Sequence, residues 1–415
     1  MTLHAAPAVD PATVHWPAGI RLGERAIATI IFLSGFVIVE PAPYDLVLVA
    51  IIVAWTAVGL RIPRATLPLV ALLLLYLVGG LLSLTQMESL QGAPLYLAIT
   101  AFLAGSSVFF AAIIAQAPER RFAIISRSLI VAGVAVAAFG TIAYFEVFPG
   151  ASSFKLAGRA SGTFQDPNVF GPYLVLPAVI LTYYVLTHRL RASLWSMVWL
   201  AIIVLAIFLS FSRAAWGHLI VSTLTMAALA FVTRSNSGGR MRVAGYFVAL
   251  TVTIATMLSA AISIPAVSGI LSERAQLVQY YDAGENGRFS NQAAGLADIP
   301  AQPLGIGPGV FAEKYGDDEH NMWLKGFMAY GWLGGFAYIA LAAWTLAAAF
   351  PLLFVKRPWQ PFIHAVYSAF VGNLMIHMVI DSDHWRTLFL MYGFLWGAIA
   401  AERALRSNVA TRHGS

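Results

Sequence analysis

Long apolar stretches separated by short polar segments dominate the chain. A membrane-spanning helix needs about 17–25 mostly apolar residues. Twelve stretches approach this requirement, at about residues 22–39, 44–60, 66–84, 93–116, 122–147, 167–187, 192–212, 214–232, 242–264, 321–350, 360–380 and 386–403. The pattern predicts an all-α polytopic membrane protein with about twelve transmembrane helices. We expect one transmembrane domain at residues 21–405, a disordered tail at 1–20 and a second tail at 406–415.

Composition supports a membrane location. Hydrophobic residues make up 59% of the chain and charged residues only 11%, whereas soluble domains carry about 25% charged residues. Burying this much apolar surface requires lipid. The chain has no cysteine, which excludes disulfides and thiolate chemistry. We find no internal repeat, so a transporter built from inverted repeats gains no support.

The charges indicate an orientation. With the N-terminus in the cytoplasm and alternating spans, 17 of the 25 basic residues lie inside and 15 of the 19 acidic residues lie outside. This bias follows the positive-inside rule. It puts both tails in the cytoplasm and both long connections, about 148–166 and 265–320, outside; the second is a long periplasmic loop between spans nine and ten. Because the net charge of +6 reflects this sorting, we expect no nucleic-acid partner.

The outer side retains a few cations although the rule disfavours them there. They are Lys155, Arg159, Arg213, Arg274, Arg288, Lys314, Lys325 and Arg386. Arg213 stands between two adjacent spans, which predicts a tight turn at the bilayer edge, where an unpaired charge is costly. A guanidinium suits bidentate contact with phosphate. The alternative is contact with lipid headgroups or a nearby carboxylate.

Arg159 and Arg288 lie in the two long outer connections. Arg159 precedes Asp166-Pro167, a pair typical of a helix start, and could meet an anion near that positive helix end. Arg288 precedes residues 289–297, where we expect a short helix on the membrane surface. "QPLGIGPG" then indicates a turn. For both arginines a solvated loop charge is the alternative.

His320 follows three carboxylates, Asp317, Asp318 and Glu319, at the start of an apolar stretch. A metal site is disfavoured, because consecutive residues cannot easily all point at one ion. Acidic residues before a helix complement its dipole, which explains the carboxylates as markers of the helix start. A neutral imidazole can accept a proton near pH 7. We therefore interpret His320 as a general base and expect no metal.

Further polar residues cluster between the last two spans. The stretch "IDSDHWRTLF" holds Asp381, Asp383, His384 and Arg386 in a short outer turn. A structural salt-bridge cluster and a substrate contact are both open interpretations. His364 and His377 lie within an apolar span, and we expect them to be core residues.

Four segments together resemble a known family. They are "SGTFQDPNVFGPYL", "LSFSRAAW", "PLGIGPGVF" and "HNMWLKGFMAYGWLGG". In this order, with a long outer loop before "HN", they are similar to the O-antigen ligase and O-antigen polymerase superfamily of bacterial inner membranes. The resemblance covers most of residues 20–405. It implies a glycosyltransferase that takes a glycan from undecaprenyl diphosphate at the periplasmic face. Ligases transfer it to lipid A–core, and polymerases to another carrier-linked repeat unit.

The resemblance also assigns residues. The family's outer arginine after span seven corresponds to Arg213 and its histidine at the start of span ten to His320, both as catalytic residues. The second loop arginine falls at Arg288. We expect further substrate contacts from Arg159, His384 and Arg386. Arginines can neutralise a diphosphate leaving group and one base can activate a hydroxyl, so neither a metal nor another cofactor is expected.

Other functions stay open. Within the superfamily, a ligase competes with a polymerase of O-antigen or exopolysaccharide. A flippase or transporter of lipid-linked glycans is the alternative of a different class, but it should carry ionisable residues at the membrane midplane. Here the charges gather at the span ends. A binding or scaffolding membrane protein is the remaining alternative.

Overall fold

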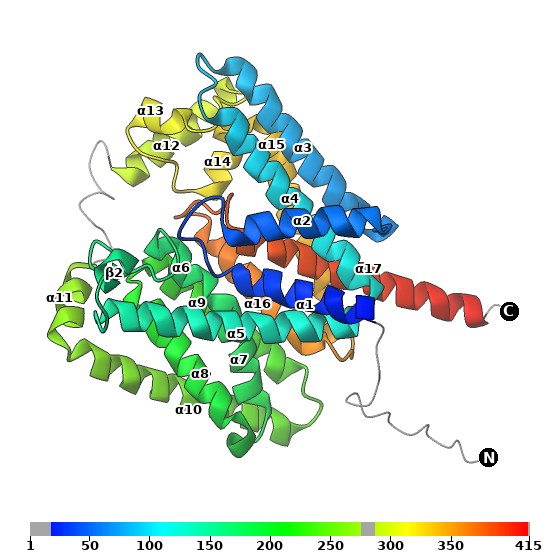
Figure 1. Cartoon of the computed structure of the whole chain (residues 1–415), viewed down its shortest axis with the longest axis vertical. Coiled ribbons are helices and arrows are strands. Elements are labelled where there is room, and N and C mark those ends of the chain that lie inside the picture. The colour runs from blue at the N-terminus through cyan, green and yellow to red at the C-terminus, as the bar shows by residue number, and fades with distance from the viewer. Residues whose placement is uncertain (1–17, 275–286, 414–415) are drawn as a thin grey trace.

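The computed structural model describes residues 18–274 and 287–413, and this part of the chain is almost entirely helical (Figure 1). The helices are α1 (Ala18–Leu33), α2 (Pro43–Ala57), α3 (Leu67–Ser83), α4 (Ala93–Gln116), α5 (Pro118–Tyr144), α6 (Pro167–Tyr173), α7 (Val175–Thr187), α8 (Leu190–Leu209), α9 (Arg213–Val232), α10 (Ser237–Ile262), α11 (Pro265–Arg274), α12 (Arg288–Asp298), α13 (Val310–Tyr315), α14 (Met322–Met328), α15 (Gly331–Ala349), α16 (Gln360–Ile376) and α17 (Arg386–His413). Two short strands, β1 (Lys155–Leu156) and β2 (Arg159–Ala160), form an antiparallel hairpin.

The helices account for the hydropathy pattern. In the described ranges, nine helical segments are long and apolar enough to cross a membrane. The other three expected spans coincide with α1, α2 and α16, which have 16, 15 and 17 residues. An all-α, multi-pass membrane protein is therefore confirmed, while the number of twelve spans and the side on which each loop lies stay predictions.

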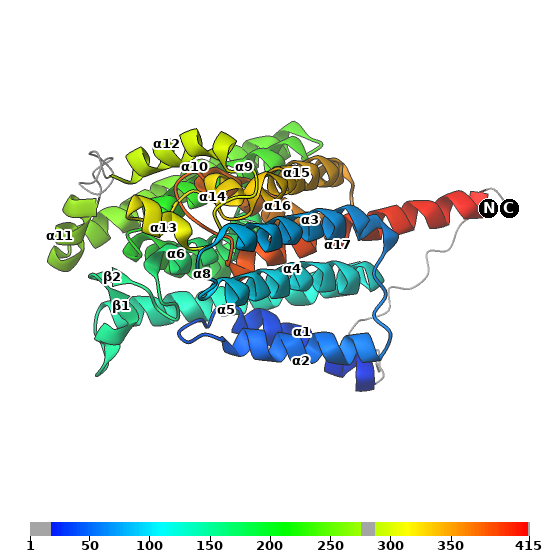
Figure 2. The same ribbon diagram turned by 90° about the horizontal axis from the view of Figure 1, so that it is seen from above.

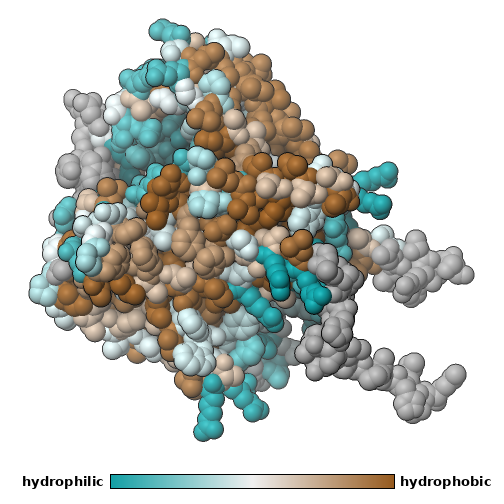
Figure 3. Space-filling model, viewed as in Figure 1, coloured by the Kyte–Doolittle hydropathy of each residue, from teal (hydrophilic) through white to brown (hydrophobic). Residues whose placement is uncertain are grey.

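The helices differ strongly in how much protein surrounds them. α17 packs against α4, α16 against α9, and α15 against α3 (Figure 2). In α17, 83% of the apolar window is buried inside the protein, whereas in α10 the value is 11%. α17 is thus a central helix, and Trp396 on it is fully buried. α10 exposes apolar side chains such as Val248 and Val252. Brown, hydrophobic residues cover much of the middle of the face in Figure 3, as expected for contact with lipid.

The expected single span at 321–350 is wrong in one respect. The chain leaves the helix after Met328 and starts α15 at Gly331, whose φ is +68°. The loop before α13 supplies a hydrogen bond at this break: the Ile306 amide donates to the Met328 carbonyl over 2.7 Å. A Cβ at Gly305 would lie 2.6 Å from the Gly331 nitrogen. Two glycines thus let this loop pack into the break, a tertiary contact that hydropathy cannot reveal.

Other boundaries follow the sequence closely or shift by a turn or more. α4 begins and ends at the predicted residues, and α12 confirms a helix at 289–297. Left-handed glycines at 305, 307 and 309 confirm the expected turn. Both predicted tails are partly helical. α1 begins at residue 18, and α17 continues to His413 rather than ending near 403. The rest of the 1–20 tail lies outside the described residues.

Candidate functional site

One pocket at the N-terminal end of α9 gathers most of the candidate residues. Its volume is about 600 Å³. Four arginines and His320 line it, and we call it the arginine pocket. Its lining consists of Arg159, Asn168, Phe211, Ser212, Arg213, Ala214, Gly217, Val221, Arg274, Arg288, Phe289, Asp317, His320, Met375, Ile376, Val379 and Ile380. Residues from five parts of the chain meet here, and four of the eight predicted outer cations are among them.

Arg213 is positioned by a tight turn, as the sequence predicts. Only three residues separate the end of α8 from Arg213, the first residue of α9. Ser212 caps this helix by accepting a hydrogen bond from the Ala215 amide over 3.3 Å. Phe211 takes a left-handed conformation, with φ of +46°. The positive end of a 20-residue helix therefore adds to the charge of Arg213 at the pocket wall.

Arg159 is held by the hairpin and by its neighbours. Ala157 and Gly158 both have positive φ, which suits the two-residue turn of a hairpin. The Arg159 Nε donates to the Ser210 carbonyl over 2.9 Å, and Nη2 donates to Asn168 Oδ1 over 2.7 Å. Asn168 is itself fixed at the start of α6, where its amide donates to Asp166. This confirms the predicted cap and explains how a loop arginine acquires a defined position.

Two further arginines reach the pocket from the outer connection. Arg288 opens α12 and lies 5.3 Å from the ring centroid of Phe289. Arg274 is the last residue of α11, with its Nε 3.8 Å from a carboxylate oxygen of Glu273. Sequence reasoning gave Arg274 no role. The available signal was its placement among the few predicted outer cations.

His320 stands on a strained backbone that several contacts hold in place. Its φ is +43°, a conformation that costs a residue with a side chain about 1–3 kcal/mol. Gln292 from α12 donates to the carbonyls of Glu319 and His320, over 2.9 and 3.3 Å. The Asn321 amide donates to Asp381 Oδ1 over 2.9 Å. These hydrogen bonds together hold the backbone at His320 and so fix where its imidazole begins.

Asp317 gives His320 an orienting partner. Its Oδ1 lies 3.3 Å from His320 Nε2, and both side chains line the arginine pocket. When the ring is neutral and Nε2 donates to this carboxylate, Nδ1 carries the lone pair. The His320 side chain is 36% exposed, so a hydroxyl in the pocket can reach it. A base held by a carboxylate is a recurrent catalytic arrangement.

The expectation that the carboxylates mainly mark the helix start is wrong. Asn321 caps α14 by accepting a hydrogen bond from the Leu324 amide. Asp317 instead pairs with His320, and Glu319 is buried with 2% exposure. The direction in which the side chains of Asp317, Glu319 and Asn321 point decides these contacts, and the order of residues in the sequence does not reveal it.

Glu319 belongs to a compact group that we call the buried lysine cluster: Lys325, Glu319, Asp381 and Asp383. Lys325 Nζ lies 3.8, 3.3 and 3.7 Å from carboxylate oxygens of Glu319, Asp381 and Asp383. Tyr96 also donates to Asp383. Burial raises the pKa of Glu319 to about 7 against the opposing effect of Lys325, and Asp381 raises it further. Of the two interpretations of the outer turn, these contacts favour a structural cluster for its aspartates.

The structure does not bring His384 and Arg386 into the arginine pocket. His384 Nε2 lies 3.0 Å from Thr100 Oγ1. Arg386 donates through Nε and Nη2 to both carboxylate oxygens of Asp45, over 2.8 and 2.6 Å, and so ties α17 to α2. Both residues line a separate cavity of about 20 Å³. Their substrate contacts stay predictions without geometric support.

His364 and His377 are buried, as predicted, with 2% and 0% exposure. In the part of the chain that the structure describes, no group of three or more histidines, cysteines or carboxylates is arranged to hold a metal ion. No protein-family model matches the chain, and a comparison with curated proteins gave no match. Membership of the O-antigen ligase and polymerase superfamily therefore stays a prediction from the motifs.

Proposed function

We propose that the protein is an O-antigen ligase-like glycosyltransferase of the bacterial inner membrane. In this proposal it transfers a glycan from undecaprenyl diphosphate to a sugar hydroxyl, with the arginine pocket facing the periplasm. One observation carries the proposal: a single pocket combines four arginines, one carboxylate-held histidine and an apolar wall. That combination matches a donor with a diphosphate, a sugar and a lipid tail.

The donor fits the pocket through its two chemically different parts. Guanidinium groups hold diphosphate oxygens in bidentate fashion, and Arg213 and Arg159 come from rigid frames that fix their geometry. The pocket lining also includes Val221, Met375 and Val379, which offer apolar contact. The polyprenyl tail stays in lipid, and the diphosphate meets the cations at the headgroup plane.

The reaction needs one proton transfer and one displacement. His320 Nδ1 accepts the proton of the acceptor hydroxyl, whose oxygen attacks the anomeric carbon. The bond from that carbon to the diphosphate oxygen breaks, and the electron pair leaves with the diphosphate. The arginines offset the charge that develops there. Attack from the face opposite the leaving group inverts the anomeric centre. The proton on His320 then returns to water.

The test is transfer in vitro by the purified protein, from undecaprenyl-diphosphate-linked glycan to lipid A–core, with and without EDTA. We expect His320→Ala to lower the rate by a factor of about 10²–10⁴, while donor binding and thermal stability are retained. Asp318→Ala is the matched control, because Asp318 is an exposed neighbour that does not line the pocket.

Near-normal turnover of His320→Ala would exclude the general-base role. Inhibition by EDTA that a divalent ion reverses would exclude the metal-independent reaction. If the protein extends a carrier-linked glycan but leaves lipid A–core untouched, it is a polymerase of the same superfamily rather than a ligase.

A further inference from the structure

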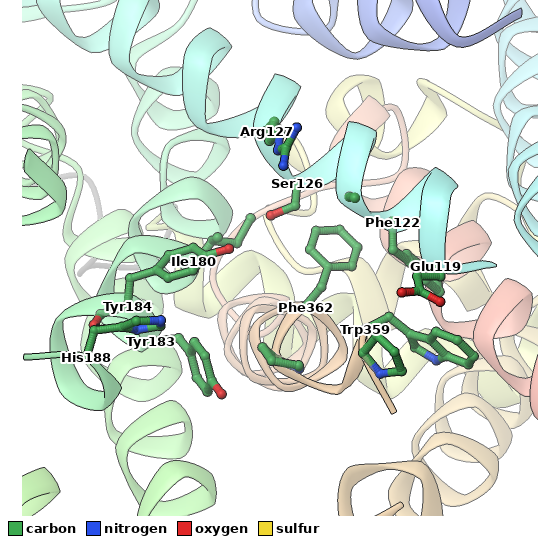
Figure 4. Close-up of a pocket in the computed structure, with 13 residues that line it drawn as sticks. Glu119, Phe122, Ser126, Arg127, Ile180, Tyr183, Tyr184, His188, Trp359 and Phe362 are labelled. Atoms are coloured by element: carbon green, nitrogen blue, oxygen red, sulfur yellow. The ribbon is translucent and has the colours of Figure 1, made fainter. Parts of the chain in front are cut away.

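Three adjoining cavities lie at the opposite end of the bundle, which under the predicted orientation is cytoplasmic. The first, of about 450 Å³, lies between α5, α7 and α16, and Figure 4 shows its aromatic side chains Phe122, Trp359 and Phe362. The second, of about 180 Å³, shares Tyr183 with the first. The third, of about 320 Å³, shares Arg234 with the second. The three cavities thus lie next to one another near the end of α9 and the start of α10.

The middle cavity is positively charged. Arg234 and Lys356 line it, Arg242 follows in the third cavity, and the described lining of these two cavities holds no acidic residue. Within the described ranges, the side chains of Arg234 and Lys356 form no hydrogen bond or ion pair with another protein group. Lysine and arginine gathered at the cytoplasmic ends of membrane helices attract anionic lipid headgroups. The cavity therefore suits a phosphate group.

His364 adds a second, independent indication of a ligand. It lines the middle cavity and is only 2% exposed. Its Nε2 donates to the Leu353 carbonyl over 2.7 Å, so the neutral ring leaves Nδ1 as an acceptor. That Nδ1 is buried and has no partner in the protein. An unmet buried acceptor costs about 1–3 kcal/mol, and a hydroxyl donor from a ligand would satisfy it.

The edge of the cavity indicates where the ligand comes from. Phe354 lines the cavity and is 49% exposed, and Phe231, which follows the lining residue Ala230 in sequence, is 38% exposed. These rings put apolar surface beside the cations, where lipid would lie. A phosphate that enters from this side carries acyl chains, and it need not cross the protein to reach Arg234.

We propose that the middle cavity binds the headgroup of an anionic glycerophospholipid that carries free hydroxyls, of the phosphatidylglycerol type. The phosphate lies between Arg234 and Lys356, and a headgroup hydroxyl donates to His364 Nδ1. The lipid belongs to the leaflet opposite the arginine pocket. This site is independent of glycosyl transfer, and it anchors the end of α9 and the start of α16 to the membrane.

The experiment is a native mass spectrometry titration of the purified full-length protein with phosphatidylglycerol, and with phosphatidylcholine of the same acyl chains. We expect clear preference for the anionic lipid. Each cation contributes about 1 kcal/mol, so Arg234→Gln should weaken binding about fivefold and the double change with Lys356→Gln about 25-fold. Arg61→Gln is the matched control, because Arg61 is an exposed cation of the same predicted side that lines none of the three cavities.

Two further probes separate the parts of the site. Phosphatidylmethanol has the same charge but no free hydroxyl, and it should bind several-fold more weakly than phosphatidylglycerol. Inorganic phosphate at millimolar concentration should not displace the lipid. Equal retention of phosphatidylcholine, or unchanged binding by the double variant, would overturn the site. Equal binding of phosphatidylmethanol would overturn the His364 contact, and displacement by inorganic phosphate would identify free phosphate as the ligand.

Discussion

The arginine pocket and the buried lysine cluster lie at the same end of the bundle, but they differ in the ratio of cations to carboxylates. In the cluster, one lysine with 8% exposure lies among three carboxylates of the protein. Among the described residues, four arginines and a single carboxylate line the pocket, whose volume is about 600 Å³. The cluster balances its lysine with carboxylates of the protein, whereas the pocket gathers cations that, in the proposed function, contact the diphosphate of the donor.

The two regions are also connected. Glu319 belongs to the cluster and His320 to the pocket, and Asp381 of the cluster accepts the Asn321 amide over 2.9 Å. The cluster therefore holds the backbone on both sides of His320 and so helps to fix this residue in the pocket. Variants of the cluster should therefore change stability, and variants of the pocket should change turnover.

The largest effect is expected for Lys325→Met. Removing the lysine leaves buried carboxylates without their counter-charge, which typically costs about 3–5 kcal/mol. We expect this loss in the free energy of unfolding, measured by denaturation of the purified protein in detergent. Lys314→Met is the control, because Lys314 pairs with Asp298 at the surface, where such pairs contribute at most about 1 kcal/mol. Equal losses in the two variants would contradict the structural role of the cluster.

Arg213→Lys should have the next largest effect, and on rate alone. Lysine keeps the charge but loses the planar fork that holds two phosphate oxygens. A charged hydrogen bond is worth about 1.5–3 kcal/mol, so transfer should slow by about ten- to a hundredfold without a change in melting temperature. Arg61→Lys, at the other end of the bundle, should transfer normally. Full activity of Arg213→Lys would instead indicate a simple lipid-headgroup contact.

A smaller effect concerns the pH dependence of stability. Burial raises the pKa of Glu319 to about 7 from an ordinary value of 4.5. Between these values the folded protein binds more protons than the unfolded chain, so stability falls as the pH rises from about 5 to about 7. Glu319→Gln cannot ionise and should remove about 2 kcal/mol of this fall. Thermal unfolding at several pH values measures it, with exposed Glu313→Gln as a control that keeps the wild-type slope.

Sequence reasoning succeeds where one physical property decides the outcome. Hydropathy alone sets α4, and the Asp166-Pro167 pair is enough to start α6. The positive-inside rule drew attention to Arg213 and Arg288, which the fold then brings into one pocket. These predictions need only local chemistry and the preference of charges for one side of a membrane.

The rest depends on contacts between distant segments. The partners of Lys325 include Asp381 and Asp383, which follow it by more than fifty residues. Lys325 was noticed only as an unexplained outer cation, and its proximity to Glu319 suggested no pairing. The break between α14 and α15 likewise depends on Gly305. A sequence read segment by segment cannot show which loops pack together.

The left-handed residues at the arginine pocket have a consequence for evolution and engineering. Phe211 and His320 both carry side chains in a conformation that glycine adopts without cost. The His320 side chain is 36% exposed, so selection for heat tolerance alone would favour glycine there, and this would delete the imidazole. Thermostable variants obtained without an activity screen should lose function at this pocket early. At Phe211 the same change should not be favoured, because the ring is buried with 2% exposure and its loss would leave a cavity.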